Sequence, residues 1–333
     1  MTPGLRLVPI ACAAVALQGC VAAAVPALAG SAIAGKRLLG DGDRELPAAA
    51  PRPVPQAALD AAIAAGPAPE ASVPPAMQYL YGSGEAAALS LQSYMALANF
   101  LIARSSDREV GHDVPSVVMA PGSTINSPQF VACGEKPLAV VLDVDETALL
   151  NIGYEEDEAR RVGGYDPQRW DRWEKTGAAG VAAVPGALEA LAVARRADIA
   201  VVFNSNRSNA NAAQTAAAIE GAGLGTPTHR DTLWLKGDAG EGSGKDARRA
   251  AIAEKYCVIA MVGDQLGDFS DLFNAPGVGI AARRAAIQGR ELEILWGQGW
   301  FLLPNPVYGT GLQGGFDDVF PADKAWADPA GGQ

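Results

Sequence analysis

The chain has 333 residues, of which 49% are apolar and 19% are charged, and its formal net charge is -11. This composition supplies enough apolar material for a sizeable core and excludes a wholly disordered protein. The acidic balance argues against a nucleic-acid-binding protein, which needs a basic surface to neutralise phosphates. The only two histidines are His112 and His229, so a His-rich zinc or di-iron site is excluded and a His-centred catalytic triad is disfavoured.

The N-terminal segment has the pattern of an export signal. Arg6 precedes a stretch from Leu7 to Gly35 without any charged residue, which is typical of such signals. Three outcomes remain open: lipoprotein processing at Cys20, cleavage after Ala27-Leu28-Ala29, or an uncleaved helix that spans a bilayer of about 30 Å. All three export the protein.

We adopt lipoprotein processing as the prediction. Leu17-Gln18-Gly19-Cys20 resembles the bacterial lipobox, in which the cysteine is acylated and becomes the first residue of the mature protein. The resemblance implies a signal peptide over residues 1–19 and lipidation of Cys20. We therefore expect a lipid-anchored protein of the bacterial cell envelope. We expect it to be attached to the outer membrane and to face the periplasm or the cell surface.

A tether and one globular domain are predicted to follow. Residues 37–75 are rich in Ala and Pro, and such a composition cannot bury enough apolar surface to order itself. We assign residues 20–75 to the lipid anchor and tether and residues 76–325 to the globular domain. Residues 326–333 are expected to form a flexible tail.

The globular domain begins with a predicted amphipathic helix over residues 84–104, with Ser83 as its N-cap. Its apolar residues close to helical spacing are Leu89, Tyr94, Leu97 and Leu101.

Three continuous apolar runs follow, at residues 138–142, 199–203 and 258–262, as expected of parallel strands that are buried on both faces. The second and third runs lead into helical stretches at 208–222 and 267–274. Repetition of strand, polar turn and helix predicts an α/β fold with a doubly wound parallel sheet. Ligands of such sheets bind beyond the carboxyl ends of the strands.

Two cysteines lie close to these strands. Cys133 precedes the first run and Cys257 opens the third. If the two strands are neighbours, both cysteines lie near the same edge of the sheet. An exported compartment permits a disulfide between them, and the alternative is two buried, small apolar side chains.

Polar and acidic residues follow each apolar run. The first run ends in Asp143-Val144-Asp145-Glu146-Thr147, the second in Asn204-Ser205-Asn206-Arg207 and the third in Gly263-Asp264-Gln265-Leu266-Gly267-Asp268, while Lys245 precedes the helix that leads into the third. Clustered carboxylates repel one another unless a cation neutralises them. Hard oxygen ligands without His or Cys select Mg²⁺, and a lysine and a hydroxyl suit a phosphate dianion. The residues therefore predict a magnesium-dependent phosphoryl-transfer site with an aspartate nucleophile.

These motifs, in this order, resemble those of the haloacid dehalogenase-like (HAD-like) phosphatases, and more closely the class C acid phosphatases, the outer-membrane lipoprotein 5'-nucleotidase family. Outside the strand ends the resemblance rests on three further stretches: Tyr165-Asp166-Pro167-Gln168-Arg169-Trp170-Asp171, Val184-Pro185-Gly186-Ala187 and Leu303-Pro304-Asn305-Pro306-Val307-Tyr308-Gly309. It covers about residues 78–320 and implies a HAD-like Rossmannoid fold.

The resemblance implies a role for each residue of the motifs. Asp143 is the nucleophile that forms an aspartyl phosphate, and Asp145 is the general acid and base. Mg²⁺ is held by the side chains of Asp143 and Asp264 and by the backbone carbonyl of Asp145. Asp268 either reaches the metal through water or holds Lys245.

The phosphate-binding residues implied by the resemblance are Ser205, Asn206 and Lys245. Thr147 is expected to support the first loop by hydrogen bonding. Arg207 either belongs to this phosphate site or is a solvated surface charge.

The resemblance also places a small, mostly helical cap at residues 149–183. Trp170 and Trp173 in this cap either line the substrate pocket or form its core. Tyr308 matches an aromatic residue that stacks a nucleobase, and Tyr154 is a second candidate for this role.

The resulting hypothesis is a Mg²⁺-dependent acid phosphatase that hydrolyses small phosphomonoesters, especially nucleoside 5'-monophosphates, and binds no nucleic acid. One alternative is a catalytically inactive surface-binding lipoprotein. The other is a phosphotransferase that uses the same intermediate and passes the phosphoryl group to an alcohol.

Overall fold

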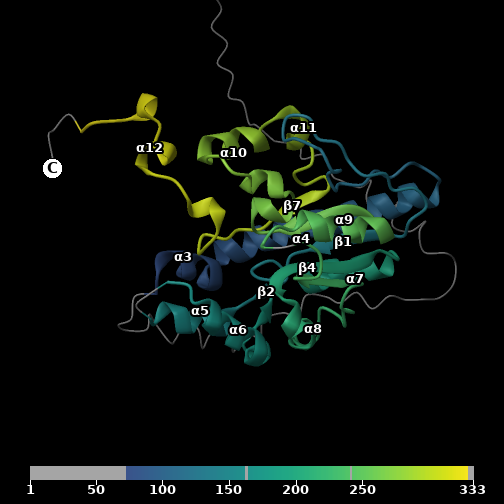
Figure 1. Cartoon of the computed structure of the whole chain (residues 1–333), viewed down its shortest axis with the longest axis horizontal. Coiled ribbons are helices and arrows are strands. Elements are labelled where there is room, and N and C mark those ends of the chain that lie inside the picture. The colour runs from purple at the N-terminus through teal and green to yellow at the C-terminus, as the bar shows by residue number, and fades with distance from the viewer. Residues whose placement is uncertain (1–72, 162–163, 241, 329–333) are drawn as a thin grey trace, which may run out of the picture. The chain divides into compact units, whose positions relative to one another are not determined.

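A computed structural model of the chain describes residues 73–161, 164–240 and 242–328 (Figure 1). The predicted signal peptide, the lipidated Cys20, nearly all of the tether and the last residues of the tail lie outside this described part, so those assignments stay predictions.

The domain is built on one sheet of five parallel strands in the order β5-β4-β1-β6-β7. The strands are β1 (Leu138–Leu142), β4 (Ala200–Ser208), β5 (Leu233–Lys236), β6 (Cys257–Gly263) and β7 (Trp300–Leu302). The three predicted strands are confirmed as β1, β4 and β6, at the centre of the sheet. The two edge strands were not predicted, because their apolar runs are only a few residues long.

Helices cover both faces of the sheet, so β1 is buried throughout. Side chains of a strand alternate between faces. Val140 and Leu142 accordingly pack in the core that α4 (Gly84–Glu109), α7 (Ala187–Arg196) and α8 (Ala212–Gly221) cover. Ala139 and Val141 pack in the core beneath α9 (Asp246–Lys255), α10 (Ile280–Ile287) and α11 (Arg290–Glu293). The predicted doubly wound α/β fold is therefore confirmed.

Helix α4 begins where the sequence predicts, and the Ser83 Oγ accepts a hydrogen bond from the backbone N–H of Ala86 at 3.1 Å. By length and composition α4 could also cross a membrane, but Tyr94 packs in the sheet core together with Leu97 and Leu101. Leu89, the fourth apolar residue at helical spacing, does not join them and is 44% exposed. Ser90 takes the buried position instead, four residues before Tyr94, and donates its hydroxyl hydrogen to the Ala86 carbonyl.

The prediction of a helix over residues 267–274 was also wrong. Two short 3-10 turns stand there, η4 (Leu266–Asp268) and η5 (Asp271–Asn274). The Asp268 carboxylate accepts hydrogen bonds from the backbone N–H groups of Asp264 and Gln265. Such local bonds compete with the helical pattern. The stretch predicted as a helix over 208–222 begins as a 3-10 turn, η3 (Asn209–Asn211), and continues as α8.

Residues 149–183 form a small group of elements between β1 and α7, seen in teal with labels α5, α6 and β2 in Figure 1. It contains β2 (Leu149–Leu150), α5 (Ile152–Ala159), α6 (Pro167–Thr176), η2 (Ala178–Gly180) and β3 (Ala182–Ala183), and β2 pairs antiparallel with β3. Trp173 lies inside this group. A Cβ atom on Gly180 would come within 2.8 Å of the Trp173 ring, so the glycine permits a close approach.

The remaining elements lie at the two ends of the described chain and include the labels α3 and α12 of Figure 1. They are α3 (Pro75–Met77), the π-helical turn η1 (Gln78–Gly82), η6 (Thr310–Leu312), α12 (Phe316–Val319) and η7 (Ala322–Lys324).

A disulfide joins Cys133 to Cys257 across 124 residues of sequence. The first of the two alternatives for these cysteines is thus confirmed.

We expect replacement of both cysteines by alanine to lower the free energy of unfolding by about 2–5 kcal/mol, because the bond restricts the unfolded chain over a long loop. Urea titration of the oxidised protein and of the variant measures this difference. The reducing agent dithiothreitol should destabilise the wild type and leave the variant unchanged. Equal stability of both proteins under oxidising conditions would contradict the prediction.

Candidate active site

The loop after β1 carries the first two acidic residues of the site. It turns sharply because Glu146 has a left-handed backbone conformation with φ 54° and because the backbone N–H of Ala148 donates to the Val144 carbonyl. As a result both Asp143 and Asp145 line one cavity.

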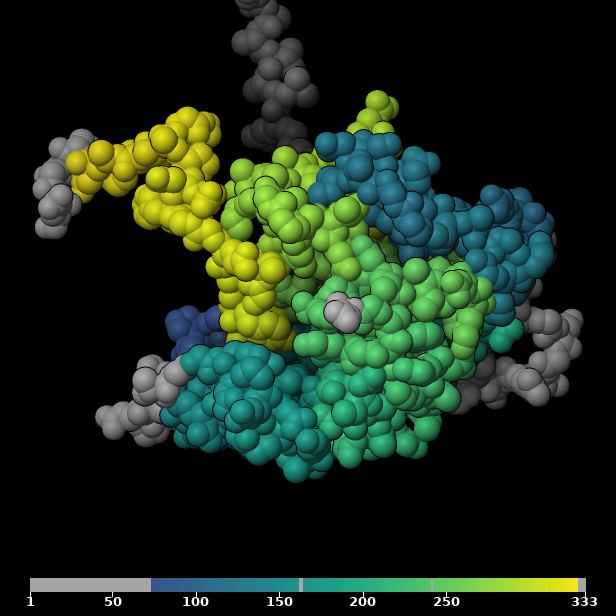
Figure 2. Space-filling view, viewed as in Figure 1, coloured from purple at the N-terminus to yellow at the C-terminus, as the bar shows by residue number. Residues whose placement is uncertain are grey.

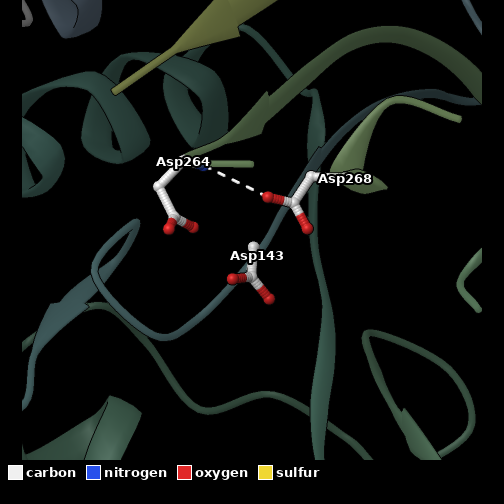
Figure 3. Close-up of side chains that lie close together, drawn as sticks. All are labelled: Asp143, Asp264 and Asp268. Atoms are coloured by element: carbon white, nitrogen blue, oxygen red, sulfur yellow. Dashed lines mark hydrogen bonds between the residues drawn. The ribbon is translucent and has the colours of Figure 1, made fainter. Parts of the chain in front are cut away.

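Three carboxylates gather where β1 and β6 end. One oxygen from each of Asp143, Asp264 and Asp268 lies within 4.8 Å of the other two, and Figure 3 shows these side chains around a common space. The dashed line in Figure 3 marks the hydrogen bond from the Asp264 backbone N–H to Asp268, at 3.2 Å. Lys245 Nζ donates to Asp143 Oδ1 at 2.5 Å and to Asp268 Oδ1 at 2.6 Å.

The electrostatics of this group favour a bound cation. Burial raises the pKa of Asp143 well above its usual range, although the positive charge of Lys245 opposes the shift. Burial, with repulsion from Asp268, raises the pKa of Asp264 to about 7. The single positive charge of Lys245 does not neutralise three carboxylates. Because all three offer hard oxygen atoms, the donor set fits a hard divalent cation.

Asp145 lies apart from these three side chains and is held by Arg207. The guanidinium donates to Asp145 Oδ1 from Nε at 2.9 Å and from Nη2 at 2.7 Å. Asn151 Nδ2 donates to the same oxygen at 2.9 Å. Arg207 is only 2% exposed, so the interpretation of it as a solvated surface charge was wrong. Its burial follows from the ion pair, which sequence spacing does not reveal.

The end of β4 supplies Ser205 and Asn206. Ser205 is fully buried, and its hydroxyl accepts from the Arg207 backbone N–H at 3.0 Å and donates to Asp145 at 3.4 Å. Asn206 is exposed and lines the cavity. The buried Arg248 holds it, donating from Nη2 to Asn206 Oδ1 at 2.6 Å. Arg248 was not predicted as a site residue, because no sequence motif marks it.

Lys245 stands at the start of α9, which Asp271 fixes in place. The backbone N–H groups of Lys245 and Asp246 donate to the Asp271 carboxylate at 2.8 and 2.9 Å. The buried Arg249 donates to the carbonyl of Asp268 and to the Asp271 carboxylate. The loop that carries Asp268 and the helix that carries Lys245 are therefore tied together.

Asp264 is oriented by neighbours from three segments. Thr147 Oγ1 donates to it at 3.0 Å, Asn305 Nδ2 at 2.7 Å and Gln265 Nε2 at 3.1 Å. Thr147 thus connects the loop after β1 to Asp264. A side chain at Gly263 would place its Cβ 2.3 Å from the Cβ of Asp268, which explains the glycine before these aspartates.

Glu146 is a buried carboxylate that the sequence analysis did not single out. The hydroxyl groups of Tyr81 and Tyr308 donate to it, and so do the backbone and side-chain N–H groups of Asn151. Burial raises its pKa to about 7. Glu146 therefore joins the start of the described chain, the first loop and the C-terminal segment.

Tyr308 and Tyr154 both line the cavity. Tyr308 is 38% exposed, whereas Tyr154 is 5% exposed and packs edge-to-face with Trp170 at a centroid distance of 4.8 Å. Trp170 also lines the cavity, whereas Trp173 donates from Nε1 to Asn151 and packs inside the 149–183 group. Trp170 therefore lines the cavity, as the first alternative predicts, and Trp173 belongs to the core of the 149–183 group, as the second predicts.

The cavity has a volume of about 860 Å³. Its floor is formed by the residues at the strand ends, and its walls by α5, by α6 and by residues 307–310. Figure 2 shows this C-terminal segment, in yellow, against the teal surface of residues 149–183. A volume of this size accommodates a small molecule much larger than a phosphate ion.

Comparison with known proteins agrees with this arrangement. The sequence profile of the family described as HAD superfamily, subfamily IIIB (Acid phosphatase) matches residues 106–311. The class C acid phosphatase from Bacillus anthracis has a similar structure, with 23% sequence identity, a TM-score of 0.54, and coverage of 71% of this chain and 84% of that chain. The same enzyme with tungstate bound gives 24% identity, a TM-score of 0.54 and the same coverage. Because these sequence identities are below 25%, the two matches show that the folds are similar and carry no conclusion about activity.

Proposed function

We propose that this chain, which belongs to the acid phosphatases of the HAD superfamily, subfamily IIIB, hydrolyses nucleoside 5'-monophosphates with Mg²⁺ through an aspartyl-phosphate intermediate. Membership of the family makes it a phosphomonoesterase. The observation that carries the finer proposal is the placement of Asp143 between Lys245 and the other buried carboxylates, with Asp145 held separately by Arg207.

In the first step, an Asp143 oxygen attacks phosphorus while the bond from phosphorus to the leaving alcohol breaks. Asp145 donates its proton to the departing oxygen. In the second step, Asp145 takes a proton from water, the water oxygen attacks phosphorus, and the bond to Asp143 breaks to release inorganic phosphate. Arg207 keeps the Asp145 carboxyl in one orientation through both steps.

Asp143 and Asp264 would hold the Mg²⁺ ion, together with the Asp145 backbone carbonyl that the family resemblance implies. The ion would supply positive charge that lets an anionic nucleophile approach an anionic phosphate. Both Asp268 oxygens are engaged, one by Lys245 and the other by backbone N–H groups, which supports the alternative in which Asp268 holds Lys245. Lys245 and Asn206, which line the cavity, would bind the phosphate oxygens. Ser205, the third residue predicted for this role, is fully buried and donates to Asp145 instead.

The nucleotide preference rests on the aromatic walls of the cavity. Tyr308 is partly exposed and faces a cavity large enough for a nucleoside, and an aromatic ring stacks on any nucleobase. Tyr154 and Trp170 line the same cavity from α5 and α6. Among these residues we assign base stacking first to Tyr308, because Tyr308 is the more exposed of the two tyrosines.

Phosphate release from AMP, glucose 6-phosphate and 4-nitrophenyl phosphate tests the proposal. We expect EDTA to abolish release and excess Mg²⁺ to restore it, because the three carboxylates repel one another without a cation. The nucleotide should be hydrolysed fastest. Circular dichroism with EDTA serves as the control for folding. Full activity after thorough chelation would refute the metal, and equal rates on all three esters would refute the nucleotide preference.

We further propose that the protein is lipid-anchored in the cell envelope. The Leu17–Cys20 motif and the Ala/Pro-rich stretch after it support this, and the disulfide suits an oxidising compartment. Replacement of Cys20 by serine should move the protein from the membrane fraction to the soluble fraction, whereas Cys12→Ser should not. A Cys20→Ser protein that stays with the membrane would favour the uncleaved helix.

A further inference from the structure

Glu155 is a buried carboxylate that faces the cavity without a hydrogen-bond donor. It lies on α5, is 5% exposed and lines the cavity. Among the residues that the structure describes, none donates a hydrogen bond to its side chain. Burial raises its pKa to about 7, opposed by the positive charge of Arg169. Arg169 in turn is engaged by Glu158 and donates to the Tyr154 hydroxyl at 3.3 Å.

The other buried glutamates of the site have donors. Glu174 accepts from the Ser208 backbone N–H at 3.0 Å and from Asn211 Nδ2 at 2.8 Å, and Glu146 accepts from two tyrosines and Asn151. Burial removes most of the water around such a carboxylate, and a hydrogen-bond donor compensates for that loss. Because the Glu155 side chain borders the cavity, a donor on a bound ligand can supply the missing bond.

The position of Glu155 identifies the part of the ligand that it meets. Phosphate binds at the floor of the cavity, beside Asp143 and Lys245, so the leaving alcohol must occupy the remaining space. Glu155 belongs to the α5 wall of that space together with Tyr154, and the exposed Tyr165 lines the same cavity. The alcohol therefore meets both an aromatic surface and a carboxylate.

We propose that Glu155 accepts hydrogen bonds from the adjacent 2'- and 3'-hydroxyl groups of the substrate's ribose and thereby selects ribonucleotides. This rests on the proposed nucleotidase function. The two oxygens of one carboxylate match two neighbouring hydroxyl donors, and a site that hydrogen-bonds a substrate hydroxyl rejects the analogue that lacks it.

The experiment compares AMP with 2',3'-dideoxy-AMP, which has the same base and phosphate. For the wild type we expect kcat/KM to be about 10- to 100-fold higher for AMP. In Glu155→Ala this ratio should fall to near one, and in Glu155→Gln it should be intermediate, because the amide keeps one acceptor oxygen. Glu156→Gln is the matched control: Glu156 is exposed and pairs with Arg160, so this variant should keep both the ratio and the activity.

Calorimetric binding of adenosine and 2',3'-dideoxyadenosine gives a second readout that does not require turnover. The wild type should bind adenosine more tightly, and Glu155→Ala should lose this difference. A wild type that does not discriminate in either assay, or a Glu155→Ala protein that keeps the full ratio, would overturn the proposal. If the wild type releases no phosphate from 4-nitrophenyl phosphate with Mg²⁺, the proposed catalysis is refuted instead. The binding comparison would then still test whether Glu155 recognises the ribose hydroxyl groups.

Discussion

Replacement of Asp143 by asparagine is expected to lower kcat by at least about a thousandfold, because the amide cannot form the aspartyl phosphate. Asparagine has nearly the same shape, so the loop after β1 should keep its conformation. The variant also removes a carboxylate whose pKa is raised by burial and by repulsion from Asp268 and Asp264, and the fold should therefore lose no stability from charge repulsion. Initial rates on AMP and a urea titration measure both effects.

The matched control is Asp157→Asn. Asp157 lies on α5, pairs with Arg161 at 2.7 Å and is 44% exposed in its side chain. Surface pairs of this kind contribute little, so activity and stability should stay close to the wild type. If Asp143→Asn retains more than a few per cent of the wild-type rate while Asp157→Asn is normal, Asp143 is not the nucleophile.

Replacement of Arg207 by glutamine should lower kcat on AMP by about a hundredfold, because general acid catalysis of this order depends on the orientation of Asp145. The effect on 4-nitrophenyl phosphate should be much smaller, since nitrophenolate leaves without a proton. Arg207→Lys keeps the charge but loses the paired hydrogen bonds from Nε and Nη2 and should give an intermediate rate. The ratio of kcat values for the two esters, measured for each variant, reports the role of Arg207.

Loss of a buried ion pair also destabilises proteins by about 3–5 kcal/mol, so the assays belong well below the unfolding temperature of each variant. Arg172→Gln serves as control, because Arg172 is an exposed residue of α6. An equal loss on both esters would show that Arg207 acts on the fold or on phosphate binding and does not position Asp145.

The centre of the sheet could be predicted from the sequence because its strands are buried on both faces and form continuous apolar runs. The clustering of the residues directly after these runs could also be predicted, because the carboxyl ends of parallel strands meet at one edge of the sheet. Lys245 was predicted through the order of the motifs. The short β5 and β7 were not, because a run such as Trp300–Leu302 has no periodicity to distinguish it from a loop.

The residues that hold the site in place were harder to predict, because their partners are distant in sequence. Arg207 pairs with a residue 62 positions away, and Tyr308 pairs with Glu146 across 162 positions. Charge and residue type are the same for a surface arginine and a buried one. Glu155 was missed for the related reason that a buried carboxylate in a helix of several acidic residues resembles a solvated helical face.

For the lipid anchor that we propose, the contact of Tyr81 with Glu146 bears on how the protein could be released from a membrane. Met77 lines the cavity and Tyr81 donates to the carboxylate that follows Asp145, so the segment next to the predicted tether contributes to the site. A protease that cuts upstream of residue 73 would shed a soluble phosphatase with a complete cavity. A cut after Gly82 would remove both residues, and the shed fragment would lose Met77 from the cavity lining and the Tyr81 hydrogen bond to Glu146.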